Sequence, residues 1–225
     1  MLTLIDYVKS GNIDKIKLCC EMVTKSDLTT DYIMKKDNYG STALYWASWY
    51  GHLEIVKLLI TIGNLQKEDI MMKNNNGTTA LFVASWFCYL EIVKLLITKG
   101  NLQKKDIMMK DNDGFTALIS ASCQNNLEIV KLLITIGNLQ KEDIMMKDNY
   151  GRTALYWACQ FGHLEIVRLL IIKGNLQKED ILLRSGSDNN NGETAYSMAK
   201  NQSIKQLFNN VFFNRDINDM IKDIQ

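Results

Sequence analysis

The chain has 225 residues, of which 47% are hydrophobic and 23% charged, a composition typical of a folded protein and not of a disordered segment. The 26 Lys and Arg residues nearly balance the 25 Asp and Glu residues, so the net charge of +1 argues against a nucleic-acid-binding surface. Apolar runs such as Leu53 to Ile62 are interrupted by Lys or Arg, which argues against a membrane-spanning helix, and the five scattered Cys residues favour a reducing, cytoplasmic (intracellular) compartment.

The first predicted element is a pair of helices over residues 1–34. Apolar residues recur on both sides of Gly11, at Leu4, Val8, Ile13, Ile16 and Leu18. The first ten residues lack both the basic leader and the long apolar core of a signal peptide. We therefore expect residues 1–34 to fold as a helix pair that caps the domain.

A repeated phrase follows, in the forms DNYGSTALYWAS, NNNGTTALFVAS, DNDGFTALISAS and DNYGRTALYWAC. Its glycine recurs every 37 residues, at Gly40, Gly77, Gly114 and Gly151, and a weaker fifth copy contains Gly192. This period predicts four repeats over residues 35–72, 73–109, 110–146 and 147–183, followed by a degenerate repeat and C-terminal cap over residues 184–225. The cap is expected to be one or two helices that bury an apolar set, namely Ile204, Leu207, Val211, Phe212, Ile217, Met220 and Ile221.

Within the first repeat, local signals predict two helices. Thr42 is a good N-cap for a short helix A, and Gly51 suits the left-handed turn that follows it. The segment from Leu53 onward has apolar residues at helical spacing and predicts a helix B that is ended by Gly63. Residues 64–70 predict a lengthened loop with one extra helical turn.

These motifs resemble the ankyrin repeat, because Thr42 to Ala47 matches its TPLHxA phrase and GHLEIVKLL stands at Gly51 to Leu59. The resemblance covers roughly residues 35–210 and implies an all-α solenoid of stacked helix-turn-helix units with hairpin-like loops. The chain has no proline, so Ala replaces the family's Pro in all four repeats, and Tyr, Phe or Ile replaces its His. The resemblance also implies that the hairpin tips and the exposed side of helix A face a binding partner.

The positions that vary between the repeats lie where such a partner-facing surface is expected, and many of them are aromatic. Exposed aromatic side chains mark binding sites because they bury a large area at a small cost in side-chain entropy. Trp46 and Trp157 precede a buried Ala, and we expect them to pack against neighbouring helices instead. The candidate partner-binding residues are Tyr39, Trp49, Tyr50, Trp86, Phe87, Phe115, Tyr150, Arg152 and Phe161.

No motif predicts catalysis, a cofactor or a metal site. His52 and His163 occupy the same place in two repeats, which indicates a framework role, and the acidic pair Glu68-Asp69 recurs in later repeats as solvated loop residues. We therefore expect a monomeric, non-catalytic scaffold or inhibitor that binds a protein or peptide on a concave aromatic-rich surface, without nucleic acid or membrane as partner. The alternative is a substrate-targeting adaptor of a ubiquitin-ligase type complex, for which residues 209–225 would be the discriminating segment.

One turn breaks the pattern. The residue between helices A and B is Gly51, Asn125 or Gly162 in three repeats, all suited to positive φ, but it is Cys88 in the second repeat. We expect Cys88 to adopt a strained positive φ, compensated by packing or by a functional role of its neighbours.

Overall fold

The computed structural model describes residues 3–25, 30–61, 63–186 and 192–213. In these ranges the regular structure is α-helical, apart from an isolated antiparallel bridge between Arg184 and Thr194. The chain divides into two compact units, unit 1 (Met1–Asn112) and unit 2 (Asp113–Gln225), each with its own stack of helices.

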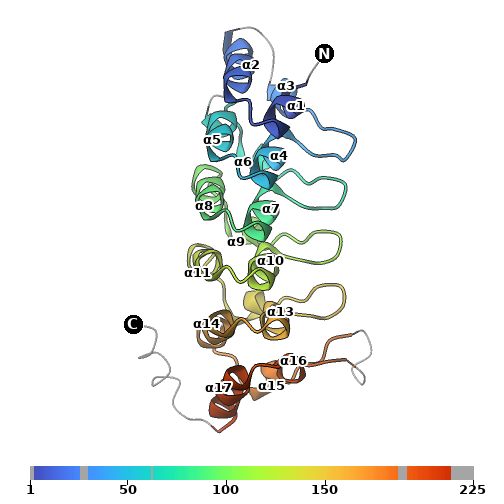
Figure 1. Cartoon of the computed structure of the whole chain (residues 1–225), viewed down its shortest axis with the longest axis vertical. Helices are drawn as coiled ribbons and strands as arrows, with labels where there is room; N and C mark the ends of the chain where they lie inside the picture. Colours follow the sequence, from blue (N-terminus) through green and yellow to red (C-terminus); the bar gives the residue numbers. More distant parts are fainter. Residues whose placement is uncertain (1–2, 26–29, 62, 187–191, 214–225) are drawn as a thin grey trace. The chain divides into compact units, whose positions relative to one another are not determined.

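In unit 1 the A helices α1, α4 and α7 lie side by side, and so do the B helices α2, α5 and α8 (Figure 1). A hairpin-like loop precedes α4 and α7, and a short third helix follows each B helix. The elements are α1 (Leu4–Lys9), α2 (Ile13–Lys25), α3 (Thr30–Ile33), α4 (Ala43–Trp49), α5 (Leu53–Thr61), α6 (Lys67–Ile70), α7 (Ala80–Trp86), α8 (Leu90–Lys99) and α9 (Lys104–Ile107).

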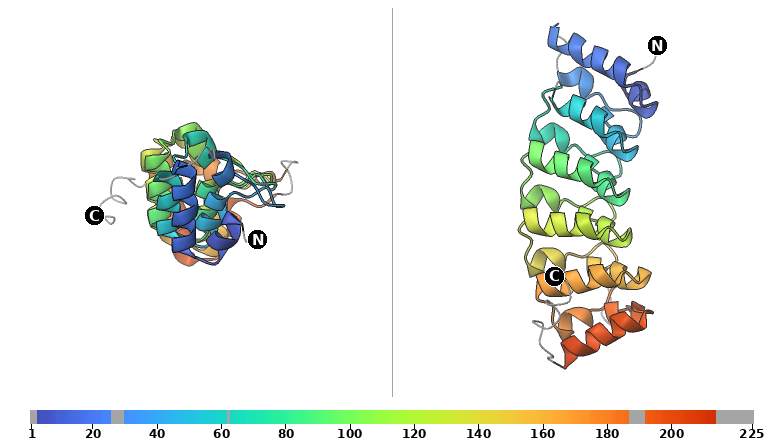
Figure 2. Two further views of the ribbon diagram at one scale, coloured as in Figure 1. Left: turned by 90° about the horizontal axis from the view of Figure 1, so that it is seen from above. Right: turned by 60° about the vertical axis from the view of Figure 1, so that its left-hand side comes forward.

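Unit 2 repeats this arrangement, with α10 packed on α13 and α13 on α16 in one layer and with α11 on α14 and α14 on α17 in the other (Figure 2). Its elements are α10 (Ala117–Cys123), α11 (Leu127–Ile136), α12 (Lys141–Ile144), α13 (Ala154–Phe161), α14 (Leu164–Gly174), α15 (Lys178–Ile181), α16 (Ala195–Met198) and α17 (Gln202–Phe212).

The helices begin where the sequence predicts. The hydroxyl oxygens of Thr42, Thr79, Thr116 and Thr153 each accept the backbone N–H three residues later at 3.2 Å, which satisfies one orphan donor of each A helix. The apolar stripe of each B helix faces inward, and its valine is fully buried in all four copies. The expected extra helical turn is confirmed as the short helices α6, α9, α12 and α15.

Helix α5 ends at Thr61, next to the predicted end at Gly63, and the left-handed residue that follows is Asn64 (φ 49°). At the C-terminal end, α17 supplies the predicted cap and buries Ile204, Leu207 and Val211, but Phe212 is only half-buried. Ile217, Met220 and Ile221 lie outside the described residues. The exact boundaries of the repeats stay a prediction.

Neighbouring hairpins of unit 1 are joined by a recurring set of hydrogen bonds. The backbone N–H of Asn75 donates to Tyr39 O at 3.0 Å, and its side-chain amide donates to Asn38 O at 3.2 Å. Lys36 Nζ donates to Lys73 O at 2.9 Å. These bonds satisfy backbone polar groups of the loops, so each of these hairpins is held in place by the preceding one.

The expected positive φ at Cys88 is confirmed at 64°. The left-handed conformation costs a Cβ-bearing residue about 1–2 kcal/mol, whereas glycine adds about 0.4–1 kcal/mol of chain entropy to the unfolded state. We predict that Cys88→Gly is more stable than wild type by about 1 kcal/mol in urea unfolding. Cys88→Ala keeps the Cβ and serves as the control, and equal stability of the two variants would contradict the strain argument.

An ion pair joins two short helices of unit 1. Lys67 Nζ lies 2.6 Å from Asp106 Oδ2, which also accepts the backbone N–H of Gln103 at 2.8 Å. Burial raises the pKa of the Asp106 carboxyl, but these two donors outweigh it and the pKa lies below its usual value. The carboxylate is therefore more stable in the folded than in the unfolded chain.

Since the folded-state pKa of Asp106 is lowered, its contribution to stability is complete above the unfolded pKa of about 3.9 and is lost as the pH falls through the folded value. We predict that Asp106→Asn lowers the free energy of unfolding by about 1.5–3 kcal/mol at pH 7 and flattens its decline below pH 4. Urea unfolding from pH 7 to pH 2.5 measures this. Asp69→Asn is the control, because Asp69 accepts the equivalent N–H from Gln66 but forms no ion pair with any residue that the structure describes. Parallel curves for Asp106→Asn and wild type would contradict the prediction.

Candidate functional site

Seven Tyr, Trp and Phe side chains of unit 1 form one connected group, which we call the unit 1 aromatic cluster. Trp46 and Tyr50 are four residues apart at the end of α4, so their rings share a helix face and stack at 5.9 Å between centroids. Trp49 contacts Trp46 at 5.9 Å and reaches Phe87 of the next repeat at 4.7 Å. The members of the cluster are Tyr39, Tyr45, Trp46, Trp49, Tyr50, Phe87 and Tyr89.

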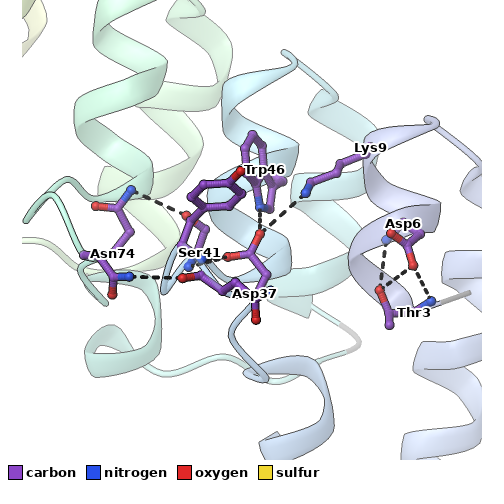
Figure 3. Close-up of polar contacts among 10 residues, drawn as sticks. Thr3, Asp6, Lys9, Asp37, Ser41, Trp46 and Asn74 are labelled. Carbon is purple, nitrogen blue, oxygen red and sulfur yellow. Dashed lines mark hydrogen bonds and ion pairs between the residues drawn. The ribbon is translucent and has the colours of Figure 1, made fainter.

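A half-buried carboxylate, that of Asp37, holds Trp46 in place (Figure 3). Trp46 Nε1 donates to Asp37 Oδ2 at 2.8 Å, and the backbone N–H groups of Tyr39 and Ser41 donate to Asp37 Oδ1 at 3.0 Å. Lys9 Nζ lies 3.5 Å from Asp37 Oδ2 and 4.1 Å from the centre of the indole ring, which adds a cation–π contact. Burial raises the pKa of Asp37, but the donors lower it further, so the carboxylate stays charged and the indole is fixed from two sides.

The cluster is partly open to solvent. Tyr39 is 68% exposed, Tyr50 44% and Trp49 37%, while Trp46 and Phe87 are half-buried. Four of the five candidate residues of unit 1 therefore lie in one connected group, joined through Trp46. Trp86 is the exception, because it is half-buried and has no ring contact within the described ranges; the contact between the repeats runs from Trp49 to Phe87 instead.

Unit 2 contains a second group, the unit 2 aromatic cluster, which is centred on Trp157. The rings of Phe115 and Phe161 lie 5.5 and 5.9 Å from the Trp157 ring. The guanidinium of Arg152 lies 4.3 Å from the Trp157 ring and 4.5 Å from the Tyr150 ring. All four candidate residues of unit 2 are therefore connected to Trp157, three directly and Tyr150 through Arg152. The sequence predicts only a packing role for this tryptophan. The members of the cluster are Phe115, Tyr150, Arg152, Tyr156, Trp157 and Phe161.

In this cluster, as in that of unit 1, an aspartate accepts the indole N–H of the central tryptophan and a cation lies over its ring. Asp148 Oδ2 accepts Trp157 Nε1 at 3.2 Å and Arg152 Nε at 2.8 Å, and its side chain is fully buried. The expectation that Trp46 and Trp157 serve only in helix packing is therefore incomplete, since both are half-buried and connect the exposed rings. A sequence signal for them exists: an aspartate stands nine residues before the tryptophan in the first and fourth repeats. The second and third repeats have Asn74 with Val83 and Asp111 with Ser120.

The two histidines extend the stacks. The ring of His52 stacks on Tyr50 at 5.8 Å and that of His163 on Phe161 at 5.9 Å. His163 Nε2 also lies 3.0 Å from Cys123 O of the preceding repeat. Both residues therefore occupy equivalent framework positions, as the repeat predicts.

The side chains that could support metal or thiol chemistry are dispersed. The residues that the structure describes include no group of three or more His, Cys, Asp or Glu side chains that could hold a metal ion. Burial raises the pKa of the Cys123 thiol to about 12 and that of Cys159 above its usual value as well. These two thiols are therefore protonated at neutral pH and poor nucleophiles.

The recurring helix pairs, hairpins and N-caps match a known repeat family along the chain. The family model for ankyrin repeats (3 copies) matches residues 4–106, 101–180 and 139–220. The chain belongs to the ankyrin repeat family. The predicted ankyrin fold class is thereby confirmed, and ankyrin repeats are in general non-catalytic modules for protein–protein interaction. A search of curated proteins gives no significant match. Among the described ankyrin helices, none is long and apolar enough to cross a membrane.

Proposed function

We propose that this ankyrin repeat chain is a monomeric, non-catalytic, cytoplasmic scaffold that binds a protein or peptide on the aromatic side of its A helices. The observation that carries the proposal is the exposed edge of the unit 1 aromatic cluster, where Trp49 contacts Phe87 and Tyr50 stacks on Trp46, with Trp49 and Tyr50 both exposed. Large aromatic side chains dominate binding energies at protein interfaces because they bury much area and lose few rotamers.

The clusters are pre-organised for binding. Trp46 is fixed by Asp37 and Lys9 before a partner arrives, and Trp157 is fixed in the same way by Asp148 and Arg152. A partner therefore would not have to order these rings, which lowers the entropic cost of association. The exposed side chain of Tyr39 extends the unit 1 aromatic cluster toward the tip of its hairpin, and that of Tyr150 does the same for the unit 2 aromatic cluster.

The experiment is affinity capture from a cell lysate followed by quantitative mass spectrometry and a binding titration with the captured protein. We expect the double variant Trp49→Ala/Tyr50→Ala to weaken binding by at least ten-fold, since truncation of a central aromatic residue costs about 2 kcal/mol or more. Ile136→Ala is the matched control, because Ile136 is as exposed as Tyr50 (44% each) and lies in α11, outside both clusters. Equal binding by the double variant and the control would contradict the proposal.

A further inference from the structure

The first hairpin of unit 1, residues 37–40, has an unpaired edge. Asn75 and Asn112 occupy the second position of the next two hairpins, and each donates both its backbone N–H and its side-chain amide to the preceding hairpin at 2.9–3.2 Å. Asn38 occupies the same position in the first hairpin and is exposed. Within the described part of the chain, neither of its N–H groups donates a hydrogen bond.

The carbonyl groups next to this hairpin follow the same pattern. Lys36 Nζ donates to Lys73 O at 2.9 Å, and Lys73 Nζ donates to Lys110 O at 2.6 Å. Lys36 O is the first acceptor of the series, and no described residue donates to it. The edge at residues 36–38 therefore presents the donors and the acceptor that the next two hairpins use to hold a neighbour.

A cavity of about 270 Å³ lies beside this edge, between the start of α1, the end of α3 and the segment that leads into the hairpin. Its apolar wall is formed by Leu4, Ile5 and Ile33, and Tyr32, Lys35 and Lys36 are exposed around it. Pockets for whole small-molecule ligands usually measure about 300–1,000 Å³, so this cavity suits a single apolar side chain better than a complete ligand.

The positive charges at the rim of the cavity determine which residues are favoured next to that apolar side chain in a bound segment. Lys35 and Lys36 are exposed, whereas the carboxylate of Asp37 is occupied by Trp46 and by two backbone N–H groups, with Lys9 3.5 Å away. The rim is therefore positively charged toward solvent and favours acidic residues beside the apolar one.

The geometry points to a peptide-binding site at this edge, separate from the aromatic clusters. An extended segment of a partner protein pairs its backbone with Asn38 N–H and Lys36 O, places one apolar side chain in the cavity, and sets flanking acidic residues against Lys35. This is recognition by strand addition, in which the backbone supplies affinity and the pocket supplies specificity. The segment takes the place that a preceding hairpin takes in the second and third repeats.

The test is selection of a phage-displayed random heptapeptide library on the full chain, followed by fluorescence polarisation with the enriched peptides. We expect enrichment of an apolar residue flanked by Asp or Glu, and a loss of affinity of at least ten-fold in Asn38→Pro. Proline suits the second position of a turn and keeps the carbonyl that Asn75 uses, but it removes both donors of Asn38. Asn38→Ala keeps the backbone N–H and should bind within about three-fold of wild type.

Three further variants separate the alternatives. Lys35→Met introduces the residue that stands at the aligned position of the next repeat, Met72, and should weaken acidic peptides several-fold, while Lys99→Met should not. Trp49→Ala should leave peptide affinity unchanged, so that failure of this site is distinguishable from failure of the proposed aromatic surface. The proposal is overturned if no peptide is enriched, if affinity depends on Trp49 and not on Asn38, or if peptides bind only after residues 1–2 are deleted, which would make those residues the occupant.

Discussion

Replacement of Asp148 by alanine is expected to lower the free energy of unfolding by about 3 kcal/mol. The Asp148 side chain is fully buried and accepts four hydrogen bonds, from Arg152 Nε, Trp157 Nε1 and the backbone N–H groups of Tyr150 and Arg152 at 2.8–3.2 Å. Removal of one partner of a buried ion pair costs about 3–5 kcal/mol, and the lower end applies because Arg152 keeps 23% of its side chain exposed. Urea unfolding followed by Trp fluorescence measures the change.

Asp148→Asn separates the two roles of this residue. Asn74 occupies the equivalent position in the second repeat, where its Oδ1 accepts the backbone N–H groups of Asn76 and Thr78 at 3.0 Å. Asparagine can therefore support the turn but cannot neutralise Arg152, so we expect a loss of about 1–2 kcal/mol, clearly smaller than for alanine. Equal losses for the two variants would show that the ion pair, and not the turn, carries the whole effect.

The fold was predictable because its signals are local and repeated. The Thr N-caps and the apolar stripes act within a few residues, and both recur with a spacing of 37 residues. The structure confirms the helices that these signals predict. The end of helix B shows the limit of such signals. The glycine at Gly63 predicts where the helix ends, but it does not reveal that the left-handed residue is the next one, Asn64.

The candidate site was predictable only in part, because its centre depends on contacts between separate segments. The exposure of Trp49 and Tyr50 follows from their place at the end of helix A. The role of Trp46 depends on Asp37, which lies in the preceding hairpin, and on Lys9, which lies in the preceding helix pair. The spacing of nine residues between aspartate and tryptophan indicates the first of these contacts, but nothing within one repeat indicates the contact with Lys9. The pairing of Trp49 with Phe87 likewise depends on the side-chain rotamers, which the repeat does not determine.

Substitution of Gly114 by alanine is expected to be far more damaging than the same substitution at Gly162, although both glycines lie in unit 2 with nearly equal positive φ (82° and 77°). A Cβ at Gly114 would lie 2.6 Å from Asn149 Oδ1 and 2.7 Å from Asn149 N, whereas a Cβ at Gly162 would meet nothing within 4 Å. The left-handed backbone alone costs alanine about 1 kcal/mol net of the entropy it removes from the unfolded chain, which is the loss expected for Gly162→Ala.

At Gly114 the backbone of Asn149 would have to move, and this would disturb the hydrogen bond of 2.9 Å from Asn149 N to Asp113 O that joins two hairpins. Overpacking of this kind adds about 1–3 kcal/mol, so Gly114→Ala should lose about 3 kcal/mol in all. Urea unfolding of the two variants measures the difference directly, because the contribution of backbone strain is shared and cancels. A difference below about 0.5 kcal/mol would mean that the hairpins of unit 2 shift apart without cost, and that their stacking does not hold the repeats in register.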